Sequence, residues 1–222
     1  MTEGEEVHGT ASRDVARRED AVRGSGAEAM RYLTSLPVVD LTIDGVEMLA
    51  VFEPDEEEHT RRSDLNVGAV TSTALLHGLW LLPSGVPVPV DEIPDHKRHR
   101  LERATHLVDV TDAGFERLYC PPGAVRAVAF GGTRMARSLH RAAQFTPIVQ
   151  RFAVWDGLMR PSVRVLATAE ARGVGLVEFV DGATSLLLAP AVAEKGVPAV
   201  YRWWIAELAY SSWLYDNTQP VS

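Results

Sequence analysis

Apolar residues along the chain gather in short runs separated by turn residues, which is typical of strands in a globular domain. The first two runs occupy residues 37–43 and 46–54, and Asp44 and Gly45 lie between them. An Asp-Gly pair between two such runs favours the tight turn of a β-hairpin. The pattern therefore predicts two antiparallel strands near the start of the fold.

The second half of the chain alternates between strand-like and helix-like patterns. Residues 106–112, 115–121 and 124–130 predict three strands in a meander. Residues 133–145 then predict a helix, and residues 151–156 predict another strand. This order of elements indicates an α/β domain.

Residues 160–182 predict a short helix and a buried strand. Pro161 suits the first turn of the helix, and Gly173 falls where the helix ends. The following residues, 174–180, are apolar except for Glu178. A nearly continuous apolar strand after an amphipathic helix is typical of a strand covered on both faces, so we expect it to be internal to an α/β sheet.

The middle of the chain gives weaker signals. An acidic run at residues 55–58 leads into residues 63–78, which predict a helix with Ser63 as its N-cap. Residues 79–83 predict a buried strand. Residues 84–94 are rich in proline, which favours an extended connector.

The two ends of the chain differ in character. Residues 1–26 are charged and rich in small residues, which predicts a disordered or frayed tail before a single α/β domain at residues 27–222. Residues 197–217 predict a helix that covers the edge of the core. Its most apolar segment, residues 197–215, contains Arg202 and Glu207 and is shorter than the roughly 20 apolar residues that a membrane span needs.

Composition is that of an ordinary globular protein, because 46% of the 222 residues are hydrophobic and 23% are charged. Cys120 is the single cysteine, which rules out an internal disulfide and favours a reducing, cytoplasmic location. The first residues are acidic and polar with no apolar stretch behind them, so we expect no secretory signal.

Charge is divided unevenly along the chain. Residues 1–119 contain 12 basic and 23 acidic residues, whereas residues 120–222 contain 10 basic and 7 acidic residues. Two halves that neutralise each other would explain this division, and so would a mildly basic functional half. The net charge of −8 disfavours a nucleic-acid binder that works by overall charge alone.

A glycine turn before the helix predicted at residues 133–145 is the best candidate for an anion-binding site. Backbone N–H groups at the start of a helix bind phosphate well when no side chain blocks them. Arginines that follow at helical spacing share one face of the helix. The candidate phosphate-binding residues are Gly131, Gly132, Thr133, which we expect to cap the helix, Arg134, Arg137 and Arg141. The alternative is a tight turn followed by a solvated arginine stripe.

Large aromatic residues are concentrated in the C-terminal helix. A core-facing stripe is predicted to contain Tyr201, Trp204, Ile205 and Leu208. The remaining aromatics then need cover from elsewhere, either from a loop or from a partner or second copy of the chain. The candidate interface residues are Trp203, Tyr210 and Trp213.

The run from Thr133 to Phe145, followed by the run from Arg151 to Phe179, resembles the core of the restriction-endonuclease-like superfamily, the PD-(D/E)xK fold. The resemblance covers about a third of the chain and rests mostly on packing residues. It implies an Asp at one strand end and an (Asp/Glu)-x-Lys on the next strand, which hold Mg²⁺ while the lysine helps the attacking water. In the predicted meander, Asp109 and Asp112 match the first Asp, but the partner pair is missing.

A second placement of this motif falls on the first hairpin. Asp40 is followed by Glu53 and then by Asp55, which stands where the resemblance requires lysine. These three carboxylates are the candidate catalytic and metal-binding residues, and the lost lysine argues against cleavage. The alternative is a solvated hairpin end that continues into the acidic run.

We therefore expect an α/β fold with a mixed sheet flanked by helices, a restriction-endonuclease-like core and a C-terminal covering helix. The preferred function is a nuclease-like protein without a complete active site that binds nucleic acid or a protein partner in a larger assembly. A Mg²⁺-dependent nuclease with an atypical carboxylate site, and an oligomeric interaction subunit that uses the C-terminal helix, are the alternatives. No cofactor is expected unless the nuclease alternative holds, and no membrane partner is expected.

Overall fold

The structure is a computed structural model that describes residues 26–132, 134–155, 160–194 and 198–218. It has the predicted α/β class, with a mixed six-stranded sheet flanked by helices and a C-terminal helix. The tail predicted at residues 1–26 lies outside the described residues except for its last residue. No helix in the described ranges is long and apolar enough to cross a membrane.

The chain forms two compact units, and each unit joins segments that are far apart in the sequence. The first contains the described residues of Met1–Val51 and Arg126–Lys195, and the second contains those of Phe52–Val125 and Gly196–Ser222. Each unit has its own cluster of buried apolar side chains.

The predicted hairpin is confirmed in the first unit. Strand β1 (Val38–Ile43) pairs in antiparallel register with β2 (Val46–Pro54). The turn between them consists of Asp44 and Gly45, with φ angles of 51° and 74°. Positive φ at both central residues is the geometry of a type I′ turn, which Asp-Gly adopts at low cost because glycine has no Cβ.

Three parallel strands follow in the same sheet, whose order is β1-β2-β5-β6-β7-β8. They are joined by two crossover helices. These elements are β5 (Gly123–Gly131), α5 (Met135–Gln144), β6 (Gln150–Trp155), α6 (Val163–Ala171) and β7 (Gly175–Val180). The prediction that residues 174–180 form an internal strand is confirmed, because β7 lies between β6 and β8.

Strand β8 (Ala183–Leu188) was not predicted from the sequence. It pairs with β7 in antiparallel register, and the turn between the two strands is Asp181-Gly182, with φ angles of 48° and 78°. This is the same turn signal that identified the first hairpin. The strand was overlooked because it lies at the sheet edge with most of its residues exposed, so it lacks a clear apolar alternation.

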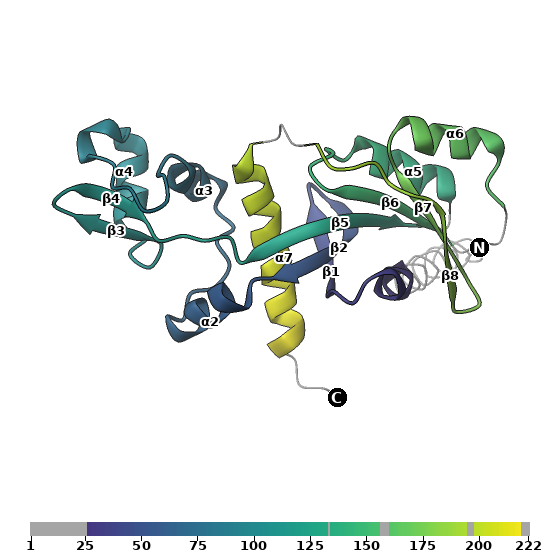
Figure 1. Cartoon of the computed structure of the whole chain (residues 1–222), viewed down its shortest axis with the longest axis horizontal. Helices are drawn as coiled ribbons and strands as arrows, with labels where there is room; N and C mark the ends of the chain where they lie inside the picture. The colour runs from purple at the N-terminus through teal and green to yellow at the C-terminus, as the bar shows by residue number, and fades with distance from the viewer. Residues whose placement is uncertain (1–25, 133, 156–159, 195–197, 219–222) are drawn as a thin grey trace, which may run out of the picture. The chain divides into compact units, whose positions relative to one another are not determined.

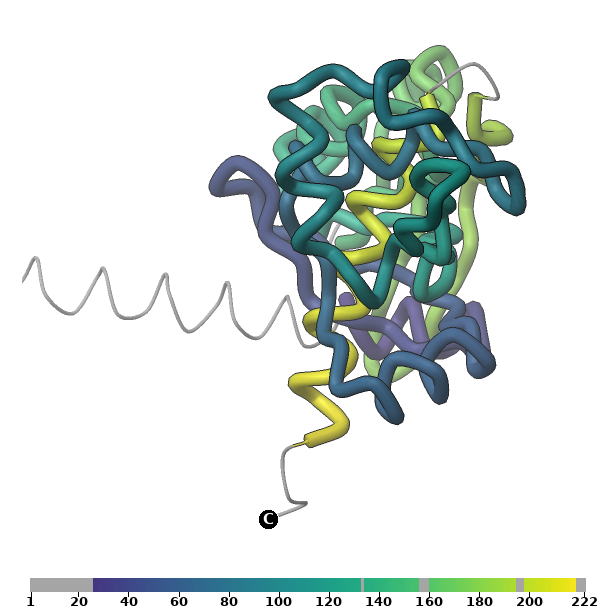
Figure 2. The backbone as a smooth tube through the Cα atoms, turned by 90° about the vertical axis from the view of Figure 1, so that its left-hand side faces the viewer, coloured from purple at the N-terminus to yellow at the C-terminus, as the bar shows by residue number. Residues whose placement is uncertain are grey.

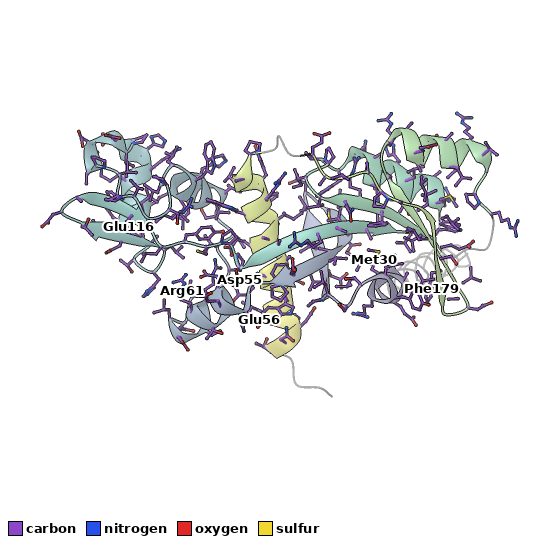
Figure 3. The ribbon with its side chains drawn as sticks, viewed as in Figure 1. Met30, Asp55, Glu56, Arg61, Glu116 and Phe179 are labelled. Carbon is purple, nitrogen blue, oxygen red and sulfur yellow. The ribbon has the colours of Figure 1, made fainter. Side chains whose placement is uncertain are left out.

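Helices cover the two faces of the sheet in the first unit. Figure 1 shows α5 and α6 along one side and the helical residues 26–33 along the other. Met30, which Figure 3 labels, is buried in a cluster with Leu49, Ala129 and Val177. The sheet residue Phe130 contacts Phe145 at the end of α5, with 5.9 Å between the ring centroids.

The second unit is mostly helical. Figure 2 shows α7 as the yellow helix, and α3 packs against α7. A two-stranded antiparallel sheet, β3-β4, completes it. Its elements are α2 (Glu56–Asp64), α3 (Thr73–Trp80), the 3-10 helix η1 (Val90–Glu92), α4 (Asp95–Glu102), β3 (Val108–Thr111), β4 (Gly114–Arg117) and α7 (Ala199–Thr218).

Two predictions for residues 55–83 are wrong. The acidic run begins helix α2, with Asp55 as its N-cap, and Ser63 lies inside this helix. The next helix begins after Ser72, whose side chain caps it. Residues 79–83, predicted as a strand, contain the end of α3 and the turn after it. The Asp-x-x-Glu pattern of a capping box was the overlooked signal at the start of α2.

The predicted meander is also corrected. Strands β3 and β4 form a sheet of their own, whereas β5 belongs to the six-stranded sheet. The proline-rich connector at residues 84–94 packs against β4 through the isolated bridges Ser84↔Arg117 and Val88↔Phe115. Proximity in the sequence suggested three consecutive pairings, but β4 instead pairs with β3 on one side and contacts the connector.

Candidate anion-binding site

The candidate site begins at the carboxyl end of a buried parallel strand. Val128, Ala129 and Phe130 of β5 are almost completely buried, which fixes the strand in the sheet. Gly131 still pairs with Val154 of β6, and Gly132 is the next residue. Ligands of parallel α/β sheets bind beyond the carboxyl ends of strands, so the position of this glycine pair suits a binding site.

Helix α5 begins immediately after the glycine turn. Its N-cap is Arg134, which has extended backbone angles (φ −123°, ψ 105°) and forms no side-chain cap. The Arg134 carbonyl accepts hydrogen bonds from the N–H groups of Arg137 and Ser138 at 2.9 and 3.2 Å. The N-cap was expected at Thr133, which lies outside the described residues.

Basic residues surround the start of α5, and its first turn contains no acidic residue. Arg134 and Arg137 are exposed, and Arg141 is partly buried one turn after Arg137. The opposite face of the helix is buried through Leu139 and Ala142. Cations near a helix N-terminus oppose the helix dipole, at a cost of about 0.3–1 kcal/mol each, whereas a bound anion is stabilised there. The charge pattern therefore suits an occupied anion site better than an empty one.

Ser138 occupies the fourth position of α5, and its side chain is directed towards the glycine turn. Its exposure is only 1%, and its Oγ atom has no hydrogen-bond partner in the described part of the chain. A Cβ atom added to Gly132 would lie 2.9 Å from Ser138 Oγ. Side chains in a helix point back towards the N-terminus, which accounts for this direction. Ser138 was not among the residues predicted from the sequence, although it lies between two that were.

The three carboxylates predicted as a metal site lie on three different elements, β1, β2 and the N-cap of α2. Asp40 is exposed on β1 and pairs with Leu49, which precedes Glu53 by four residues along β2. Asp55 accepts a hydrogen bond from the N–H of Glu58 at 2.9 Å and so caps α2 (Figure 3). Catalytic and metal-binding roles for these residues stay predictions.

Metal-binding side chains do not cluster in the part of the chain that the structure describes: no group of three or more His, Cys, Asp or Glu residues is placed to hold an ion. Asp109 is exposed on β3, in the two-stranded sheet, and Asp112 follows in the adjoining turn. The structure therefore places these two outside the six-stranded sheet.

The aromatic side chains of α7 are covered to different degrees. Tyr210 is only 1% exposed. Trp213 is partly buried and stacks on Tyr210, and Trp203 is partly buried beside Tyr119 and the Arg117 guanidinium. The predicted core-facing stripe is wrong at Tyr201, which is 50% exposed. An interface role for Trp203, Tyr210 and Trp213 stays a prediction, and in this structure Tyr210 has cover within its own unit.

A buried ionic network in the second unit was missed from the sequence. Arg62 is fully buried and donates hydrogen bonds to Glu207 at 2.9 Å through both terminal nitrogens, and to Glu58 at 2.7 Å through Nε. Glu207 also accepts the backbone N–H of Val70 at 2.7 Å. The spacing of Glu58 and Arg62 was a usable signal, whereas Glu207 lies 145 residues from Arg62.

This network sets the protonation of Arg62 and of Tyr119, whose ring lies next to the Arg62 guanidinium. Burial lowers the pKa of Arg62, but hydrogen bonds and charge attraction from Glu207 and Glu58 outweigh it and raise that pKa above its usual value. Burial, helped by the Glu207 charge, raises the pKa of Tyr119. Arg62 therefore stays charged and Tyr119 stays neutral, which indicates a structural network rather than an acid–base pair.

Arg151 has a comparable structural role in the first unit. Its guanidinium donates hydrogen bonds to the Phe145 carbonyl at 3.0 Å, after α5, and to the Arg172 carbonyl at 2.6 Å, after α6. Burial lowers the pKa of Arg151. One side chain thus binds the last carbonyls of both crossover helices, which holds α5 in place beneath the candidate site.

Comparisons with models of known protein families, with curated proteins and with solved structures all give no match. The geometry of the chain favours the glycine turn with the start of α5 as the candidate site.

Proposed function

We propose that this chain is a nucleic-acid-binding protein that does not cut its ligand. Phosphate groups bind at the glycine turn and the amino end of α5, and Arg134, Arg137 and Arg141 extend the contact along the phosphate backbone. The main observation behind this proposal is the charge at the exposed start of α5. Directly after Gly131 and Gly132, this region has basic residues and no acidic ones.

Two further observations support this proposal. Residues 120–222, which include the site, have three more basic than acidic residues, although the whole chain is acidic. Arg137 and Arg141 are four positions apart on the helix, about 6 Å along its axis, so both reach one extended ligand on the same side. A local basic face can bind phosphate even when the net charge is negative, because salt screens charges farther than about 8–10 Å away.

Asp55 argues against cleavage by this chain. The nuclease resemblance requires a lysine at this position, and Asp55 supplies an N-cap to α2 instead. Without the lysine, the motif lacks the group that would help the attacking water.

The test is the salt dependence of binding to a fluorescently labelled single-stranded oligonucleotide, measured by anisotropy. Each phosphate contact contributes about 0.7 to the slope of log Kd against log salt for a single strand. We expect the double variant Arg137→Ala/Arg141→Ala to reduce this slope by about 1.4. The control Arg164→Ala/Arg172→Ala removes the same charge from exposed positions in and after α6 of the same unit, and should leave the slope unchanged.

Two results would overturn the proposal. An unchanged slope in the α5 variant, or an equal reduction of the slope in the control, would show that the α5 arginines do not contact the phosphates. Cleavage of the oligonucleotide with Mg²⁺, abolished by Glu53→Ala, would show that the chain is a nuclease. Melting temperatures of all variants are measured in parallel, so that loss of folding is recognised as such.

A further inference from the structure

The hydroxyl group of Ser138 is in an unusual position for a serine in a helix. Such a hydroxyl normally donates back to the carbonyl four residues earlier, which here belongs to Arg134. That carbonyl accepts the N–H groups of Arg137 and Ser138, while Ser138 Oγ is buried with no partner in the described residues. A buried hydroxyl without a partner is unfavourable, so a ligand oxygen that supplies one is favoured.

Gly132 lies directly beside this hydroxyl. Its φ angle lies outside the left-handed region, so the backbone conformation does not require glycine. An added Cβ would come within 2.9 Å of Ser138 Oγ, so a larger residue at this position would push the hydroxyl aside. Gly132 and Ser138 therefore belong to one small feature at the start of α5.

We infer that Gly132 and Ser138 form a pocket for one terminal oxygen of a phosphomonoester. This inference deepens the proposed function and rests on it for the nucleic-acid part of the ligand. The Ser138 hydroxyl donates to the phosphate oxygen, the helix N-terminus faces the same group, and Arg134 and Arg137 lie at the rim. The preferred ligand is a nucleic-acid strand with a phosphorylated end.

The burial of the hydroxyl and the charge of the site both favour a monoester over an internal phosphodiester. A monoester has three terminal oxygens and a charge of about −1.5 to −2 at neutral pH, so one oxygen can enter a narrow opening while the others meet the arginines. A diester has a single negative charge and a chain on both sides of the phosphorus. The depth of the hydroxyl, which is 1% exposed, makes this difference in width important.

The experiment compares three ligands for the full chain by anisotropy and calorimetry. These are an oligonucleotide with a 5′-phosphate, the same oligonucleotide with a 5′-hydroxyl, and inorganic phosphate as a competitor. We expect the phosphorylated end to bind at least roughly tenfold more tightly, which is the size of one hydrogen bond to a charged group. Ser138→Ala should abolish this difference and leave binding of the 5′-hydroxyl strand unchanged.

The matched control is Ser162→Ala, because Ser162 is the N-cap of α6 and its hydroxyl already has a partner. This variant should keep the preference for the phosphorylated end. Without ligand, Ser138→Ala should melt at the same or a higher temperature than the wild type, because it removes an unpaired buried hydroxyl. Correct folding of this variant keeps the binding result interpretable.

The outcomes separate the inference from the proposed function. Equal binding of the two oligonucleotides by the wild type, or a preference that survives in Ser138→Ala, overturns the monoester pocket while nucleic-acid binding stands. Binding of inorganic phosphate that Ser138→Ala abolishes, without binding of either oligonucleotide, supports the pocket with free phosphate as its ligand and overturns the proposed function. Competition by inorganic phosphate against the phosphorylated strand alone supports both.

Discussion

Individual residues show where sequence reasoning failed in this protein. The acidic run at residues 55–58 was read as solvated surface, yet Glu58 is 4% exposed and pairs with Arg61 and Arg62. The usual rule that charge runs are exposed holds for Asp55, Glu56 and Glu57. It fails at Glu58, because Arg62 and the distant Glu207 complete a buried network with it. Nothing local to Arg62 indicates that partner, so tertiary contact decides its burial.

Removing Arg62 should destabilise the fold strongly. Arg62→Met leaves Glu207 buried without its cation, whereas Glu58 keeps its ion pair with Arg61. Loss of one partner of a buried ion pair typically costs about 3–5 kcal/mol of unfolding free energy. The double variant Arg62→Met/Glu207→Gln should lose less than the sum of the two single variants, because it leaves fewer unpaired charges. Urea unfolding monitored by tryptophan fluorescence measures these values. Strictly additive losses would contradict direct coupling between the two side chains.

Several helices and strands were predicted correctly from local signals. The Asp44-Gly45 turn, helix α5 and strand β7 depend on spacing within a few residues, and the sequence predicted each of them. The Asp181-Gly182 turn carried the same signal and was overlooked. Helix α2 was missed because Ser63 was taken as a cap, whereas Asp55 caps a helix that already contains Ser63.

Asp55 offers a test that separates a capping role from a metal-binding role. Asparagine and aspartate are similar N-caps, so Asp55→Asn should keep the stability of the wild type. Asp55→Ala should lose about 1 kcal/mol, because the N–H of Glu58 loses its acceptor. Thermal and urea unfolding give both values. Stabilisation of the wild type by Mg²⁺ that disappears in Asp55→Asn would contradict the purely structural role.

At the scale of the whole molecule, the two compact units could not be read from the sequence. Each consists of two segments, and the chain passes between the units near residues 51 and 125, among other places. The first point lies inside β2 and the second inside β5. Because a strand is continuous there, the sequence pattern gives no sign of a boundary between units. The sequence predicted an anion-binding site at the junction of β5 and α5, but not the buried hydroxyl of Ser138, whose direction follows from helix geometry and packing.

The central claim is that nucleic acid binds at the start of α5. The most direct test is a titration of isotope-labelled full-length protein with a 5′-phosphorylated oligonucleotide, followed by amide chemical shifts in NMR spectra. We predict that the largest changes occur at Gly131, Gly132 and residues 135–138, and that Ser138→Ala reduces them. Saturable changes confined to the second unit, or no change at a large excess of oligonucleotide, would contradict this account.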